Sequence, residues 1–156
     1  MSYQDAPDAG ATLQVSETLE AIRRRPERFL PADEPLALAI VSLLLETALR
    51  QGVAPLAVRA GEGFRAIGAD RDWLWREQGG EPYVFDRLVP LPGPVQNSFR
   101  GEILLTAFAP FWAAVTQGQV VYRSSARFDD ARVLQAAAGM GAFVVVVAET
   151  AQASTL

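Results

Sequence analysis

The chain of 156 residues contains no cysteine, no histidine and no lysine, so all 14 of its basic residues are arginines. Without cysteine there can be no disulfides, thiol nucleophiles or thiolate metal ligands. Without histidine the commonest general base and metal ligand is missing, and with it every Ser-His-Asp arrangement. Without lysine there is no Schiff-base chemistry and no Walker-type phosphate lysine. These three absences narrow the possible chemistry, and we expect no metal site.

Long apolar runs are also missing. The longest one, residues 36–45, is interrupted by Ser42 and is shorter than the ~18 residues that cross a membrane. Residues 1–11 lack the basic start and apolar block of a secretory signal. We therefore expect a cytoplasmic protein without membrane association. Residues 1–11 are predicted to be a disordered leader, residues 12–148 a single domain and residues 149–156 a flexible tail.

The net charge is −4, which disfavours nucleic acid as a partner because a broad nucleic-acid surface usually needs a basic balance. Arg23, Arg24 and Arg25 nevertheless form a basic cluster, with Arg28 close behind. Neighbouring residues fan out around a helix, and cations complement the negative end of its dipole. The cluster therefore has two interpretations. A solvated helix terminus is favoured over a site for an anionic partner.

The apolar pattern predicts an α+β fold. Helices are expected at residues 17–25, 36–51, 99–109 and 131–138. Strands are expected at residues 56–60, 64–68, 112–116, 119–124 and 142–147, with glycine turns joining the first two and the next two. Residues 69–94 are predicted to be an irregular connection that includes a short helix or strand near 83–85. This order implies a two-layer sandwich, in which a mixed and mostly antiparallel sheet is covered on one face by helices.

Residues 19–30 read Leu-Glu-Ala-Ile-Arg-Arg-Arg-Pro-Glu-Arg-Phe-Leu. This stretch resembles the Leu-Glu-Ala-Val-Arg-Lys-Arg-Pro-Gly-Met-Tyr-Ile pattern that opens the ATPase domain of DNA gyrase B. The order of elements from residue 12 to about 148 is also similar to that domain. Gyrase B, Hsp90, histidine kinases and MutL share it as the GHKL superfamily. The resemblance implies the Bergerat fold of that superfamily, which binds ATP and magnesium.

In that superfamily a helix carries a Glu that activates the attacking water and, four residues later, an Asn that holds magnesium. The resemblance aligns Leu36 with the first Leu of that helix, which places Ser42 at the Glu and Glu46 at the Asn. A serine hydroxyl cannot act as this base without help, because its proton is not removed near neutral pH. Glu46 has oxygens that suit magnesium, although a carboxylate at the solvent edge of the helix is the favoured interpretation.

The superfamily's Asp-x-Gly-x-Gly loop, whose Asp binds the adenine amino group, falls on residues 68–73. Asp70 can take the place of this Asp, but both glycines are then missing. A shifted register places Arg71 opposite a family Arg and loses the Asp. Side chains at the glycine positions would crowd a nucleotide. An Asp-rich turn is the favoured interpretation.

The superfamily's Gly-x-x-Gly-x-Gly lid wraps the phosphates with backbone N–H groups at the start of a helix. Residues 98–103 occupy its place, and only Gly101 survives there. Glu102 would bring a negative charge toward a triphosphate, which Arg100 can partly offset. The β-branched Ile103 replaces a glycine. A simple helix boundary is favoured over a phosphate site.

Two tryptophans stand close together in the connection. Trp73 and Trp75 are two residues apart in a polar stretch, where exposed aromatic side chains are typical anchors of protein interfaces. An equally weighted interpretation is that both fill the former nucleotide cavity. In that case the cavity would be occupied by side chains such as Trp73, Phe99 and Ile103.

These departures predict a pseudo-ATPase that is not an enzyme and holds no cofactor, and that acts as an interaction or regulatory module for a protein partner or as a homodimer. Trp73, Trp75, Arg23, Arg24 and Arg25 are its interaction candidates. The alternative is a rewired domain that binds ATP and magnesium through Glu46, Asp70, Arg71, Arg100 and Gly101. A third interpretation is a small-ligand or DNA-linked regulator that acts beside a topoisomerase.

Overall fold

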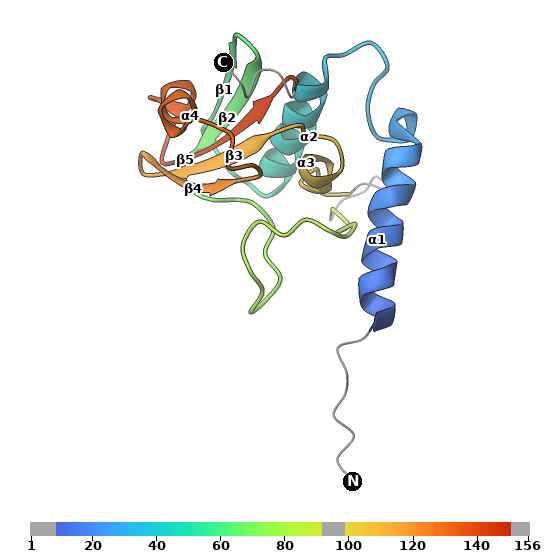
Figure 1. Cartoon of the computed structure of the whole chain (residues 1–156). Coiled ribbons are helices and arrows are strands. Elements are labelled where there is room, and N and C mark those ends of the chain that lie inside the picture. Colours follow the sequence, from blue (N-terminus) through green and yellow to red (C-terminus); the bar gives the residue numbers. More distant parts are fainter. Residues whose placement is uncertain (1–8, 92–98, 151–156) are drawn as a thin grey trace.

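The computed structural model describes residues 9–91 and 99–150, with the side chains of residues 9–16 left out (Figure 1). Residues 1–8 of the predicted leader and 151–156 of the predicted tail therefore lie outside the described residues. Within the described ranges, no helix combines the length and the hydropathy that a bilayer span requires.

The first helix is longer than expected. Helix α1 (Ala9–Arg24) begins eight residues before the predicted start at residue 17, so that prediction is wrong. Ser16 can cap a helix, but nothing between residues 9 and 16 stops one, so Ser16 lies inside it. Pro26 ends α1 as predicted and opens the short 3-10 helix η1 (Pro26–Arg28), where a proline is well placed at the first position.

Helix α2 (Leu36–Arg50) confirms the strongest helix prediction. Pro35 precedes its first turn, and Gly52 follows its end with a φ of 72°, a backbone conformation that glycine adopts easily. The side chains that α2 buries are Ala37, Ala39, Ile40, Val41, Leu44, Thr47 and Ala48. This apolar surface makes α2 the helix on which the sheet packs.

Five strands form one antiparallel sheet in the order β1-β2-β5-β3-β4. The strands are β1 (Leu56–Gly61), β2 (Phe64–Ala69), β3 (Trp112–Thr116), β4 (Gln119–Arg123) and β5 (Phe143–Ala148). Both predicted hairpins, β1–β2 and β3–β4, are confirmed. The last strand, β5, lies between the two hairpins, and every one of its residues is buried.

Helices lie on the sheet, and the predicted α+β class is confirmed (Figure 1). On one face, Val145 and Val147 of β5 share a core with α2 and with α3 (Ile103–Ala107). On the other face, Val144 and Val146 share a second core with α4 (Asp130–Ala137). The short helix α4 thus covers part of the second face, because β5 is apolar at both alternating sets of positions. Helix α1 contacts α3.

The connection after β2 is irregular, as predicted. From residue 70 to 91 the chain forms neither a helix nor a strand, apart from an isolated bridge between Pro90 and Phe99. No element forms near residues 83–85, where Tyr83 adopts a φ of 67°. Aromatic packing fixes this loop instead, since Tyr83 and Phe85 both lie against Trp112 of β3. Helix α3 is shorter than the 99–109 predicted from sequence.

Replacing Ile40 with Ala should lower the free energy of unfolding by about 2–5 kcal/mol, because the fully buried side chain would leave a cavity between α2 and the sheet. Leu49→Ala on the same helix is the control. Its side chain is 58% exposed, so the expected change is within about 0.5 kcal/mol. Urea denaturation measures both variants. Equal costs would contradict this packing of α2.

Candidate functional site

The segments that the resemblance assigns to a nucleotide meet at one place: α2, the start of the loop after β2, and residues 99–102 before α3. Gly101 lies directly against α2, where its N–H donates to Thr47 Oγ1 at 3.0 Å. A Cβ atom added to Gly101 would lie 3.0 Å from the carbonyl carbon of Leu43, which is a tight contact, so glycine suits this close approach. Thr47 in turn donates to Leu43 O at 2.8 Å. The segment before α3 is therefore closed onto α2.

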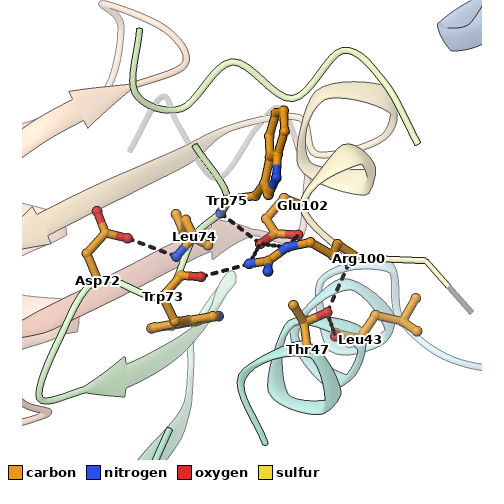
Figure 2. A network of polar contacts seen from close by, with 9 residues as sticks. Leu43, Thr47, Asp72, Trp73, Leu74, Trp75, Arg100 and Glu102 are labelled. Atoms are coloured by element: carbon orange, nitrogen blue, oxygen red, sulfur yellow. Dashed lines mark hydrogen bonds and ion pairs between the residues drawn. The ribbon is translucent and has the colours of Figure 1, made fainter. Parts of the chain in front are cut away.

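A buried ion pair lies beside this contact (Figure 2). Arg100 Nη2 is 2.6 Å from Glu102 Oε1, and Arg100 Nε is 3.0 Å from the same oxygen. The side chains are 9% and 2% exposed. Arg100 Nη2 also donates to Trp73 O at 2.8 Å, and the backbone N–H of Trp75 donates to Glu102 Oε1 at 3.1 Å. The pair therefore ties the loop after β2 to the beginning of α3.

Almost no space remains around this pair. The cavity there has a volume of about 10 Å³. Its lining residues are Trp75, Phe85, Arg87, Val89, Arg100, Glu102 and Ile103. A single water needs roughly 10–15 Å³, and small-molecule sites usually measure about 300–1,000 Å³. A nucleotide cannot occupy this cavity while the loop keeps its position.

Asp72 organises the rest of the loop. Its carboxylate accepts hydrogen bonds from Arg76 Nη2 at 2.7 Å, from Tyr83 Oη at 3.1 Å and from the backbone N–H of Leu74 at 2.9 Å. The Arg76 guanidinium lies 5.7 Å from the centre of the Tyr83 ring. Burial of the phenol, with the Asp72 carboxylate as the next cause, raises the pKa of Tyr83 to about 12. The sequence offered no signal for this cluster, whose members are spread over an irregular stretch.

Three of the predicted nucleotide ligands lie at the surface. Glu46 pairs with Arg50 at 2.9 Å, with 48% of the Glu46 side chain exposed. Asp70 is exposed, and Arg71, also exposed, donates to Gln51 O at 3.4 Å. None of the three lines the cavity beside Arg100. Within the part of the chain that the structure describes, no three acidic side chains are placed to hold a metal ion.

Arg100 and Gly101 come together as the resemblance implies, but both are already engaged. The Arg100 guanidinium binds Glu102 and Trp73 O. The N–H groups of Arg100 and Gly101 donate to Val89 O and to Thr47 Oγ1. In this structure the Arg100 guanidinium is engaged by the Glu102 carboxylate, so its expected contact with a phosphate stays a prediction.

The two tryptophans have different environments. Trp73 is 6% exposed and meets Phe143 of β5 edge to face at 5.3 Å. The interpretation as an exposed anchor is therefore wrong for Trp73, which packs in the core, and the filling of a former nucleotide cavity stays a prediction. Ile103 is also buried, and Phe99 packs edge to face against Phe29. Trp75 is only half-buried at the edge of the small cavity and stays an interaction candidate.

The arginines at the end of α1 and in η1 differ in their contacts with the described residues. Arg23 donates to Ala107 O and Thr106 O, each at 3.0 Å, so it satisfies carbonyl groups at the end of α3. Arg24 pairs with Glu20 at 2.8 Å on its own helix. Arg25 and Arg28 are exposed and make no ion pair with any described residue. The Arg23 contact spans more than eighty residues of sequence, which a local pattern cannot reveal.

Comparisons with known proteins do not add a relative. No family model, no curated protein and no solved structure matches the chain. The functional assignment therefore rests on the geometry of the site and on the sequence resemblance.

Replacing Arg100 with Met should lower the free energy of unfolding by about 3–5 kcal/mol, because Glu102 would keep a buried charge without its partner. The double variant R100M/E102L should recover most of this loss, since it removes both charges. Urea denaturation of the two single variants and the double variant measures the coupling. Arg24→Met, in an exposed pair, is the control and should cost at most about 1 kcal/mol. Equal costs for Arg100→Met and the control would contradict a buried pair.

The raised pKa of Tyr83 predicts a loss of stability at alkaline pH. The phenol of an unfolded chain titrates near pH ~10, whereas Tyr83 in the folded protein titrates at about 12. Between these values the folded state retains a proton that the unfolded state has lost, so the contribution is complete below pH ~10 and is lost as the pH rises toward 12. Ultraviolet titration should show a phenol that ionises at about pH 12, and this signal should be absent in Tyr83→Phe and still present in Tyr122→Phe. Identical curves for all three proteins would contradict this environment.

Proposed function

We propose that this protein is a non-catalytic member of the GHKL type, a pseudo-ATPase that serves as a protein-interaction or regulatory module in the cytoplasm. The resemblance of residues 19–30 to the opening of the gyrase B domain supports this assignment. So does the order of the observed elements, which are two helices, a hairpin, a long connection, a helix, a hairpin, a short helix and a strand. The buried ion pair between Arg100 and Glu102 is the main support for the proposal that the protein neither binds nor hydrolyses ATP.

The pair removes the groups that would bind phosphate. A lid that cradles phosphates needs free backbone N–H groups at a helix start, together with a positive field. Here the N–H groups of Arg100 and Gly101 donate to Val89 and Thr47. The Glu102 carboxylate neutralises the arginine and would repel a triphosphate. A phosphate would have to displace these bonds and expose a buried carboxylate, which is costly.

The catalytic position is also unsuited to hydrolysis. Ser42, which the resemblance aligns with the catalytic Glu, donates its hydroxyl to Leu38 O at 2.8 Å within α2. The hydroxyl hydrogen of Ser42 is therefore used in a hydrogen bond within α2. No histidine or lysine can act as the base, because the chain has neither residue. The contact of Ser42 within α2 and the buried pair before α3 both support a protein without turnover.

A fold that no longer opens for a nucleotide retains its surface for partners. The loop between β2 and α3 exposes Val84 and Leu88, which are 48% and 46% exposed, and leaves Trp75 half-buried. Apolar side chains held in a fixed loop are typical of a surface that binds another protein. The proposed partner is a protein or a second copy of this chain.

ATP and ADP at millimolar concentration, with and without magnesium, should not raise the thermal unfolding temperature. A fold that bound nucleotide would gain roughly 2.7 kcal/mol at about 100 times the dissociation constant, which a thermal-shift assay detects. The Asp70→Asn variant should behave like the unchanged protein. Stabilisation by ATP that disappears in Asp70→Asn but persists in Asp86→Asn, a matched control outside the aligned motif, would overturn the proposal in favour of the rewired ATP-binding domain.

A further inference from the structure

A hollow of about 490 Å³ lies where α1 ends and η1 begins. It is lined by Thr18, Ala21, Ile22, Arg24, Arg25, Arg28, Phe29 and Leu88. We call this the α1 groove. The last turn of α1 and the 3-10 turn after Pro26 together bring its arginines beside an apolar floor, and Leu88 reaches the same hollow from the loop after β2.

The charge of the α1 groove is opposite to that of the protein. Three of its lining residues are arginines and none is acidic, whereas the whole chain carries a net charge of −4. Arg24 is offset by Glu20, but Arg25 and Arg28 have no ion-pair partner among the described residues. A cleft lined by one sign of charge concentrates its field, so a negatively charged group would be attracted there.

The floor of the groove is apolar. Ile22 is 2% exposed and lies at its base, while Phe29 is half-buried and Leu88 is 46% exposed. A site for phosphate or for a nucleic-acid backbone needs cations, and phosphate groups gain little from contact with apolar side chains. A protein segment uses both parts, because an apolar or aromatic side chain can enter the hollow while flanking carboxylates meet the arginines.

A second hollow, formed by described residues on the other side of the sheet, does not present a single sign of charge. It measures about 580 Å³ and lies beside α4. Its lining contains both Glu62 and Arg132, so it presents no single sign of charge to a ligand. Of these two hollows, the α1 groove is the one whose charge favours a particular class of partner.

We propose that the α1 groove binds an acidic protein segment that carries at least one apolar or aromatic anchor. This inference rests on the proposed function as an interaction module and names the chemistry of the partner. Arg23 lies outside the groove lining and holds α1 to α3 through the carbonyls of Thr106 and Ala107, so it supports the groove without contacting the partner.

A random peptide library displayed on phage would be selected on the unchanged full chain. The eluted phage would then be depleted on the variant R25E/R28E. Both side chains are exposed and form no ion pair with a described residue, so this variant should keep its thermal unfolding temperature and remain folded. The matched control is R127E/R132E, which alters the net charge equally through exposed arginines near and within α4. We expect the retained peptides to combine Asp or Glu with Leu, Phe or Trp.

The selected peptide, labelled with fluorescein, is then titrated by fluorescence anisotropy. Its dissociation constant should rise about tenfold or more in R25E/R28E and should change little in R127E/R132E. Added salt should weaken binding, and Leu88→Ala should weaken it at constant salt. Failure to select any peptide that depends on Arg25 and Arg28, or selection of peptides without acidic residues, would overturn the proposal.

Inorganic phosphate and a single-stranded oligonucleotide are titrated in parallel. Tighter binding of either probe than of every selected peptide, lost in R25E/R28E, would also overturn the proposal and reassign the groove to phosphate groups. These outcomes are separate from the nucleotide test. The pseudo-ATPase assignment fails on stabilisation by ATP, whereas the groove assignment fails on peptide selection with no nucleotide present.

Discussion

The buried pair between Arg100 and Glu102 is the interaction on which the arrangement of α2, α3 and the loop after β2 depends. Two charges removed from water are costly unless each is paired and hydrogen-bonded. Here the Glu102 carboxylate accepts hydrogen bonds from the Arg100 guanidinium and from the backbone N–H of Trp75. The Arg100 guanidinium also donates to Trp73 O. Movement of the loop away from α3 would break these bonds together. The pair therefore fixes one position of the loop relative to α2 and α3.

Local sequence patterns predicted most of the elements, because their signals lie within a few residues. Pro35 and Gly52 bound α2, and the turn at Gln117 and Gly118 joins β3 to β4 with both residues at positive φ. The run from Phe143 to Ala148 has apolar residues on both faces and becomes the central strand. The start of α1 was missed because Ser16 gives a capping signal that the preceding residues override.

The loop after β2 could not be predicted, because its shape depends on contacts made far along the chain. Tyr83 lies against Trp112 and Tyr122 of the second hairpin, and its hydroxyl donates to Asp72. Spacing alone also left the roles of Trp73 and Trp75 undecided. The burial of Trp73 follows from its contact with Phe143, which lies seventy residues away in the sequence. The local sequence also did not reveal that Glu102 engages Arg100, because the packing of the loop against α3 brings the pair together.

The closed site and the α1 groove are connected through the same loop. Leu88, which lines the groove, is next to Val89, whose carbonyl accepts the N–H of Arg100. The buried pair holds this loop in place, so Leu88 stays beside Arg25 and Arg28. A surface that is already in its binding conformation loses less entropy on association. In the proposed function, closure of the nucleotide site thus favours a partner that binds constantly, without nucleotide control.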